Sequence, residues 1–215
     1  MWSGDSTTTP DELRNAVAAS DLDVIAITDH NSLVGALRFE ASGELGVPVI
    51  VGQEIRTVSG DLIGLYLHDR IPAGLRPVEA ARRIRGQGGL VYAPHPGDNA
   101  RQSLGESELD DLAAAELLDV IEVLNAKRQN RYQGDLRGAA AAGASDSHVP
   151  EALGAAYTEV PDLHPNDFDQ NGCDPGDPAS LLMALRAGTV EGRYFDPPRA
   201  WSARIIPSCL SAQAP

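Results

Sequence analysis

The side chains of this sequence that could do chemistry are acids, histidines and an asparagine that follow short apolar runs. Three of the five histidines fall at such positions. The set consists of Asp29, His30, Glu54, His95, Asn125, Asp146 and His148. Histidine and carboxylate together are ligands of Zn, Mn or Fe, and a carboxylate can bridge two ions where an imidazole cannot. The set therefore predicts a metal centre.

The last two members are spaced to serve neighbouring ions. Asp146 and His148 are two residues apart, so in an extended chain they point to the same side. Taken singly, other members allow plainer interpretations: His95 before Pro96 is typical of a loop histidine, and His30 could lie at the start of a helix. The metal hypothesis depends on the set as a whole.

The elements that must position these residues alternate along the chain. The apolar run from Val24 to Ile27 has no polar alternation, which predicts a strand buried on both faces. The pattern of strand, polar tip and helix then recurs several times. Such alternation indicates an α/β fold with a parallel sheet, whose functional residues follow the carboxyl ends of the strands, as in α/β barrels.

Further expected elements follow from periodicity, caps and turn residues. A helix starts at the capping box Thr9-Pro10-Asp11-Glu12, and a hairpin turns at Ser59-Gly60-Asp61 between 55–58 and 62–67. Other strands are expected over 48–51, 90–92, 119–124 and 203–206. Other helices are expected over 33–45, 77–85, 107–118, 136–142 and 178–188. Residues 1–215 are interpreted as one domain, with a loop over 161–178 and a C-terminal extension over 179–215.

Composition limits the possible partners. The formal charge is −14, which argues against nucleic acid or an anionic membrane as the main partner, because both need a basic surface. No apolar run is long enough to span a bilayer, and the first residues show no secretory signal. Cys173 and Cys209 fit no paired metal-ligand spacing and are interpreted as free thiols of a reducing compartment, so we expect a cytoplasmic protein.

The ordered set resembles the PHP (polymerase and histidinol phosphatase) family of metal-dependent phosphoesterases. The similarity covers most of residues 1 to 160. Its pieces are Thr28-Asp29-His30, Gly52-Gln53-Glu54, Pro94-His95-Pro96, Val120-Ile121-Glu122-Val123-Leu124-Asn125 and Ser145-Asp146-Ser147-His148. The resemblance implies a distorted seven-stranded (β/α) barrel, related to the TIM barrel, that holds two or three divalent ions (Mn, Zn or Fe). It also implies hydrolysis of phosphoesters, usually monoesters.

The resemblance assigns roles to individual residues. It implies the metal ligands Asp5, His30, Glu54, His95, Asp146 and His148. Glu54 would be the bridging carboxylate, and Glu54, Asp146 and His148 would also be catalytic. Asp5 could instead be a turn residue ahead of the first helix, and Asp29 is expected to orient its strand tip by hydrogen bonds. Asp61, at the hairpin near Glu54, could reach the site.

The start of the chain departs from the family pattern. The family begins with a His-x-His pair on a first strand, just before the segment that matches Trp2 to Pro10. That strand and both histidines are absent, so we expect the barrel to lack its first strand, either through a truncated start or through a real loss. A real loss would open the barrel and remove two ligands.

The function predicted from these residues is hydrolysis of a small phosphate ester by metal-activated water. The expected substrate-binding residues are Arg101, Asn125, Lys127 and Arg128, although the cations could also be solvated surface charges. Two alternatives remain open: a hydrolase of non-phosphate substrates with the same site, and a catalytically impaired metal-binding scaffold. The expected partners are a small phosphorylated substrate, no nucleic acid and no membrane.

Overall fold

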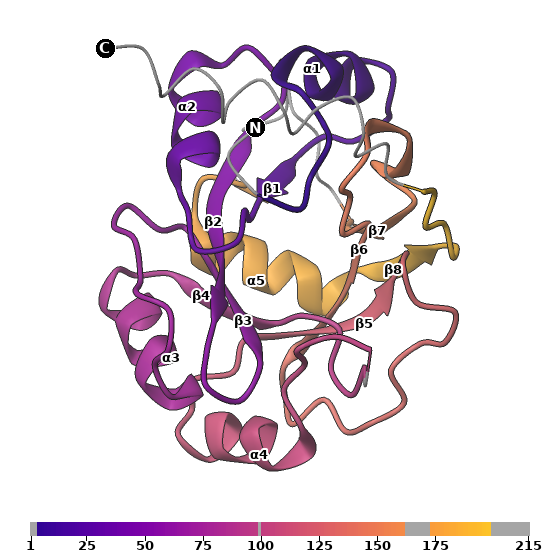
Figure 1. Ribbon diagram of the computed structural model, residues 1–215. Coiled ribbons are helices and arrows are strands. Elements are labelled where there is room, and N and C mark those ends of the chain that lie inside the picture. The colour runs from indigo at the N-terminus through magenta and orange to yellow at the C-terminus, as the bar shows by residue number, and fades with distance from the viewer. Residues whose placement is uncertain (1–3, 99, 162–172, 199–215) are drawn as a thin grey trace, which may run out of the picture.

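A six-stranded sheet forms the centre of the molecule. A computed structural model of the chain describes residues 4–98, 100–161 and 173–198. The sheet curls into a half-barrel with the strand order β1-β2-β3-β4-β5-β6 (Figure 1). Its strands are β1 (Ile25–Ile27), β2 (Val49–Arg56), β3 (Asp61–Leu65), β4 (Leu90–Ala93), β5 (Val120–Asn125) and β6 (Ala140–Ala144). The expected α/β class is confirmed.

The sheet is parallel except around β3. Strand β1 pairs parallel to β2, and β4, β5 and β6 pair parallel to one another. Strand β3 runs antiparallel to both of its neighbours because it returns from β2 through the predicted hairpin turn. Within the described residues the sheet has six strands, so the seven-stranded barrel with a missing first strand stays a prediction.

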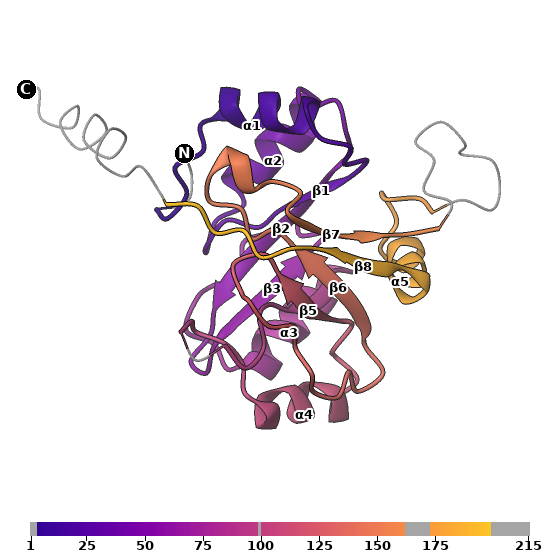
Figure 2. The ribbon, with the colours of Figure 1, turned by 90° about the vertical axis from the view of Figure 1, so that its right-hand side faces the viewer.

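Helices pack around this sheet. Their bounds are α1 (Pro10–Ala18), α2 (Val34–Ser42), α3 (Pro77–Gly86), α4 (Glu106–Ala114) and α5 (Pro178–Ala187), with a 3-10 turn η1 at Pro150–Ala152. Helices α1 and α2 lie at one end of the molecule, and α3 and α4 lie together at the other end (Figures 1 and 2). The capping box is confirmed: the Thr9 hydroxyl accepts from the Glu12 N–H, and the Glu12 carboxylate accepts from the Thr9 N–H.

The core consists of layers on the two faces of the sheet. The larger layer lies between the sheet and helices α3 and α4, and it includes Ile55, Leu62, Ile84, Leu109, Leu112 and Ile121. The smaller layer lies under α5, where Leu181 packs with Tyr92 and Val120. Among the described residues, no helix combines the length and the apolar character needed to cross a membrane.

Three expectations about the elements are wrong. Residues 140–144 form strand β6 beside β5 and not a helix, because pairing with β5 overrides the helical propensity of the alanines. Strand β1 is buried at Ile25 but exposed at Ala26, because one side of this edge strand lies along a cavity. Strand β2 continues past Val51 through Glu54, so Glu54 lies within a strand and not after one.

The C-terminal part adds a two-stranded sheet. Strands β7 (Ala156–Glu159) and β8 (Thr189–Gly192) pair antiparallel and pass close to β6. Gly143 of β6 permits this approach, since a Cβ there would lie 2.6 Å from the Tyr157 carbonyl oxygen. The predicted helix from Pro178 is confirmed as α5, whereas the strand expected over 203–206 lies outside the described residues. The division into one domain with a C-terminal extension stays a prediction.

Candidate metal centre

Five of the six residues predicted as ligands form one continuous group. His148 Nε2 lies 2.7 Å from Asp5 Oδ2, which lies 3.5 Å from His30 Nε2. His30 Nε2 is in turn 3.5 Å from Glu54 Oε2, and Glu54 Oε1 is 3.3 Å from His95 Nε2. Residues spread from position 5 to position 148 are therefore brought into one cluster of imidazoles and carboxylates.

Glu54 lies at the centre of this cluster because of its place in the sheet. It lies in the part of β2 that pairs antiparallel with β3, opposite Ile63, beyond residues 49–51 that pair parallel with β1. An isolated bridge pairs it with His30, and its carbonyl oxygen accepts from the Asn31 N–H at 2.8 Å. Its two carboxylate oxygens face two different imidazoles, which is the arrangement that a carboxylate bridging two cations requires.

Asp61 joins the cluster from the neighbouring strand. One potential ligand atom each of His30, Glu54 and Asp61 lies within 4.8 Å of the others. Asp61 is buried, and the Arg56 Nε–H donates to it at 2.5 Å. Burial, and next the charge of Glu54, raises the pKa of the Asp61 carboxyl. The hairpin between β2 and β3 thus places a further carboxylate against the predicted site.

Asp146 has a different environment from the other predicted ligands. Its Oδ2 accepts from Arg101 Nη1 at 2.8 Å and from Asn125 Nδ2 at 3.1 Å. Its Oδ1 lies 3.3 Å from His148 Nδ1 and 3.5 Å from Lys127 Nζ. Asp146 is therefore connected to the cluster through the far side of the His148 ring, and two cationic side chains are held beside it.

The remaining predicted residues lie around this centre. Lys127 Nζ is 2.7 Å from His148 Nδ1, so Lys127 and Arg101 both reach the site. Arg128 does not point there, because its guanidinium donates to the carbonyl oxygens of Pro96 and Gly97 at 2.7 and 3.4 Å. Asp29 lies beside the cluster, where burial, and next the charge of Asp5, raises the pKa of its carboxyl.

Ser103, which sequence reasoning missed, holds the His95 ring. The Ser103 hydroxyl lies 2.8 Å from the His95 carbonyl oxygen and can donate to it, while His95 Nδ1 lies 2.9 Å from the same hydroxyl. With Nδ1–H donating to Ser103, the lone pair of the imidazole is on Nε2, the atom that faces Glu54. Burial opposes a charge on His95, but in the protonated ring Nε2–H donates to Glu54, and this hydrogen bond together with the nearby carboxylates raises the pKa of the imidazole. Nothing in the local sequence around Ser103 indicates this contact.

Glu122, within the motif from Val120 to Asn125, has a contact with the site that the sequence does not predict. It is buried on β5, where Oε1 accepts from the His95 N–H at 3.1 Å and from Asn125 Nδ2 at 2.7 Å, and Oε2 accepts from the Tyr92 hydroxyl at 2.8 Å. Burial and the charge of Asp146 raise the pKa of Glu122 to about 7, against the opposing effect of His95. The sequence feature that could have identified Glu122 is a carboxylate in the middle of an otherwise apolar strand.

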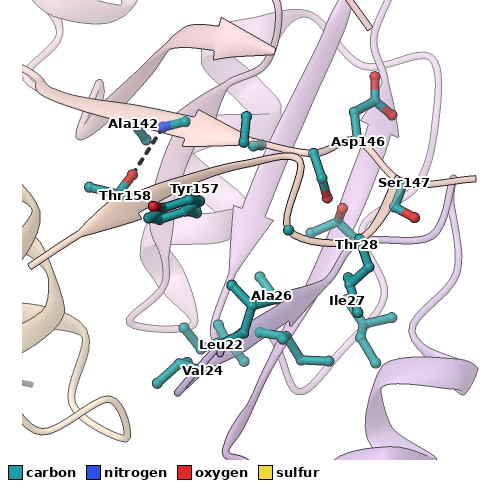
Figure 3. Close-up of a pocket in the computed structure, with 18 of the residues that line it drawn as sticks. Leu22, Val24, Ala26, Ile27, Thr28, Ala142, Asp146, Ser147, Tyr157 and Thr158 are labelled. Carbon is teal, nitrogen blue, oxygen red and sulfur yellow. Dashed lines mark hydrogen bonds between the residues drawn. The ribbon is translucent and has the colours of Figure 1, made fainter. Parts of the chain in front are cut away.

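The cluster opens into a cavity of about 1280 Å³. One wall is the exposed edge of β1 with Leu22, Val24 and Ala26, and the opposite wall includes Tyr157 (Figure 3). Asp146 and the five residues of the cluster line the same cavity. The site is therefore accessible from an apolar hollow along the sheet.

This chain is similar to known families and proteins. The family model described as PHP domain matches residues 1–154, and the model described as PHP-associated matches residues 134–190. Two uncharacterized proteins of Methanocaldococcus jannaschii are similar in sequence. One is 40% identical over 123 residues, covering 57% of this chain and 69% of the relative. The other is 36% identical over 181 residues, covering 78% and 68%.

Solved structures share the fold. A two-domain protein from Bacteroides vulgatus that contains a predicted PHP-like metal-dependent phosphoesterase matches with a TM-score of 0.61 and 18% identity. The match covers 88% of this chain, which spans 62% of the length of that protein. The lesion-specific endonuclease Q of Pyrococcus furiosus matches with a TM-score of 0.55 and 15% identity, covering 88% of this chain and 56% of the endonuclease.

The expectation that nucleic acid is excluded as a main partner is wrong. An endonuclease Q bound to a 27-mer duplex substrate, with an abasic lesion at the active site, shares this fold with a TM-score of 0.54 and 14% identity, covering 86% of this chain and 54% of the endonuclease. The physical reason is that net charge describes the whole surface, whereas the field at a site is set by the cations next to it. Arg101 and Lys127 supply such local cations despite the net charge of −14.

Proposed function

Because this chain belongs to the PHP domain family, we propose that it hydrolyses phosphoesters with divalent cations held around Glu54. The single observation that carries the proposal is the position of the Glu54 carboxylate, whose two oxygens face His30 and His95 at 3.5 and 3.3 Å. The Bacteroides vulgatus protein that contains a predicted PHP-like metal-dependent phosphoesterase shares the fold. A bridging carboxylate between two groups of imidazole ligands suits the chemistry of such enzymes.

The donor set fits two neighbouring cations. His95 and Glu54 Oε1 would hold one, and Glu54 Oε2, His30, Asp5 and His148 would hold the other. Imidazole nitrogen mixed with carboxylate oxygen suits Mn, Zn or Fe. When bound, such ions supply Lewis acidity toward the phosphoryl group and lower the pKa of a coordinated water. Asp61 lies close enough to add a further oxygen to the group around His30.

The cationic side chains beside the cluster bind the phosphoryl oxygens. Asp146 orients Arg101 and lies beside Lys127, and Asn125 donates to the same carboxylate. A guanidinium and an ammonium held in fixed positions can neutralise the charge that develops on the transferring phosphoryl group without rearranging during the reaction. In this proposal Asp146 acts mainly by positioning these cations, and His148 contributes Nε2 to the cluster.

The primary substrate proposal is a small phosphate ester that enters through the cavity beside β1. A phosphodiester within a nucleic acid is the second candidate, favoured by the fold that this chain shares with the DNA-bound endonuclease Q. Both substrates present the same phosphoryl chemistry to the cluster, so they differ in what the protein contacts outside it.

The decisive test measures turnover and bound metal in the same samples. Protein loaded with Mn²⁺ should hydrolyse p-nitrophenyl phosphate or its bis ester, and elemental analysis should find about two ions per chain. Glu54→Gln should lose most of the bound metal and lower kcat/KM more than about 100-fold, since even groups that only orient ligands are worth 10- to 100-fold. Glu79→Gln, on the exposed face of α3, is the matched control and should behave as wild type. Metal content and turnover that are unchanged in Glu54→Gln would contradict the proposal, and bound metal without turnover would favour the scaffold hypothesis.

A further inference from the structure

Lys127 is the only lysine among the 17 lysine and arginine residues of the chain. It lies in the loop after β5, where its backbone N–H donates to Asn125 Oδ1 at 2.9 Å. Its side chain is only 7% exposed, although ammonium groups normally lie in water. An ammonium is a compact charge on a flexible stem and can turn between partners more readily than the planar fork of a guanidinium. The site therefore holds a cation of the kind that can change its contacts.

His148 Nδ1 contacts both Lys127 and Asp146. It is 2.7 Å from the Lys127 ammonium nitrogen, 2.8 Å from the Asp146 carbonyl oxygen and 3.3 Å from Asp146 Oδ1. An ammonium can only donate a hydrogen bond and these oxygens can only accept one, whereas a ring nitrogen donates when it carries a proton and accepts when it does not. Nδ1 can therefore satisfy either Lys127 or Asp146, but not both at once.

The other ring nitrogen selects between these two states. His148 Nε2 lies 2.7 Å from Asp5 Oδ2. With the proton on Nε2, the ring donates to the Asp5 carboxylate and accepts from Lys127 at Nδ1, so both close contacts are hydrogen bonds. With the proton on Nδ1, the lone pair of Nε2 would face a carboxylate oxygen and an N–H would face the ammonium. The arrangement in the structure thus favours the Nε2–H tautomer of His148.

Metal binding requires the opposite tautomer. Only the lone pair of a ring nitrogen binds a cation, and the proposed function uses Nε2 together with Asp5 and His30. The proton of Nε2 then passes to solvent and another from solvent binds Nδ1, so the imidazole stays neutral. Nδ1–H donates to the Asp146 carbonyl oxygen, as the second nitrogen of a ligating histidine commonly does. Lys127 loses this acceptor and can turn to Asp146 Oδ1, which lies 3.5 Å from its nitrogen.

We propose that Lys127 and a divalent cation compete for His148, which makes Lys127 a metal-responsive positioning residue. Before metal binds, Lys127 holds His148 in the Nε2–H tautomer, in which Nε2 is not a ligand. Metal binding moves the proton to Nδ1 and releases the ammonium toward Asp146, beside Arg101. Lys127 then completes the cationic group that binds the phosphoryl oxygens, so substrate is bound well only when metal is present. The inference rests on the proposed function, because it needs a cation at His148 Nε2.

The first measurement reads the tautomer directly. Protein labelled with ¹⁵N-histidine and freed of metal is studied by NMR of the imidazole nitrogens, and His148→Gln identifies the His148 signals by their loss. Wild type should carry the proton on Nε2. Lys127→Met, which keeps an unbranched apolar side chain, should carry it on Nδ1, donating to Asp146. Arg131→Gln removes an exposed positive charge from the same loop and should keep the wild-type tautomer.

The second measurement is metal binding. Zinc, which is diamagnetic, should move the His148 proton of wild type from Nε2 to Nδ1 and shift the side-chain signal of the single labelled lysine. Calorimetry should show that Lys127→Met binds Mn²⁺ about tenfold more tightly than wild type, because a hydrogen bond from a charged donor no longer competes. The same variant should raise the KM for p-nitrophenyl phosphate, because the ammonium is lost. A merely damaged site would instead bind metal more weakly.

The outcomes separate this inference from the proposed function. If metal-free wild type carries the His148 proton on Nδ1, or if Lys127→Met leaves the tautomer unchanged, the competition is refuted even where esters are hydrolysed. It is also refuted if Lys127→Met binds Mn²⁺ no more tightly than wild type. If the tautomer and the metal affinity respond as expected but no ester is hydrolysed, the hydrolase proposal fails and the role of Lys127 stands.

Discussion

The backbone N–H of His95 donates to the Glu122 carboxylate at 3.1 Å, and this contact joins strand β5 to the candidate metal centre. His95 has a φ of +32°, a conformation that residues other than glycine adopt rarely, so it must be held in place by its surroundings. Glu122 restrains the backbone N–H of His95, and Ser103 restrains its imidazole ring. The imidazole that faces Glu54 is thus positioned by two residues that do not belong to the cluster.

Replacement of Glu122 should change how stability depends on pH. The pKa of Glu122 is raised from 4.5 to about 7 in the folded protein, so folding favours its protonated form. The stability from this group is fully present below about pH 4.5 and is lost as pH rises through about 7. In metal-free protein, the ionisation of Glu122 should lower the free energy of unfolding by on the order of 3 kcal/mol between pH 5 and pH 8.

Urea unfolding of Glu122→Gln at pH 5 and pH 8 checks this. The variant should lose that part of the pH dependence, whatever uniform loss of stability it also shows. Glu151→Gln, an exposed glutamate on η1, should keep the wild-type dependence. A Glu122→Gln curve parallel to wild type across both pH values would show that the carboxyl is not protonated preferentially on folding.

Ser103→Ala should weaken metal binding without abolishing it. The hydroxyl fixes the His95 ring so that Nε2 faces Glu54, and removal of such an orienting group typically costs 10- to 100-fold in metal affinity. Calorimetric titration with Mn²⁺ measures the loss. Ser59→Ala, at the exposed hairpin turn, serves as the control, and equal affinities of the two variants would mean that Ser103 does not orient the ring.

Asp61→Asn should also lower metal affinity, by about tenfold or more, because it removes a carboxylate oxygen that lies within 4.8 Å of donors of His30 and Glu54. The asparagine keeps the volume but loses the ion pair with Arg56, so some loss of stability is expected as well. The Mn²⁺ Kd of Asp61→Asn is compared with that of Asp69→Asn, which changes an exposed aspartate and serves as the control. An unchanged Kd would assign Asp61 to the Arg56 ion pair alone.

Removal of metal should lower the melting temperature. A ligand at 100 times its Kd stabilises a folded protein by about 2.7 kcal/mol, which corresponds to about 5 to 10 °C for a chain of this size. Thermal unfolding of wild type with Mn²⁺ and with EDTA should show this difference. Glu54→Gln, which lacks the carboxylate proposed to bridge the ions, should melt at nearly the same temperature in both. A wild-type melting temperature that ignores the metal would argue against a preformed site.

The sequence by itself determined the features that depend on near neighbours. The capping box at Thr9, the hairpin around Gly60 and the recurrence of an acid or histidine near the strand ends are all local, and each is present in the structure. The order of these motifs was also enough to identify the family. Local propensities and spacings can be read from a sequence because they do not depend on the rest of the fold.

Tertiary structure decided which side chains meet. It turned the alanines of 140–144 into a strand through pairing with β5, and it directed the two oxygens of Glu54 to different histidines. It also paired Asp146 with Arg101, 45 residues away, and placed Glu122 under His95. Such contacts join positions far apart in the chain. Their partners are selected by the packing of the sheet and by the need of each buried polar group for a hydrogen bond. Local spacing specifies neither of these.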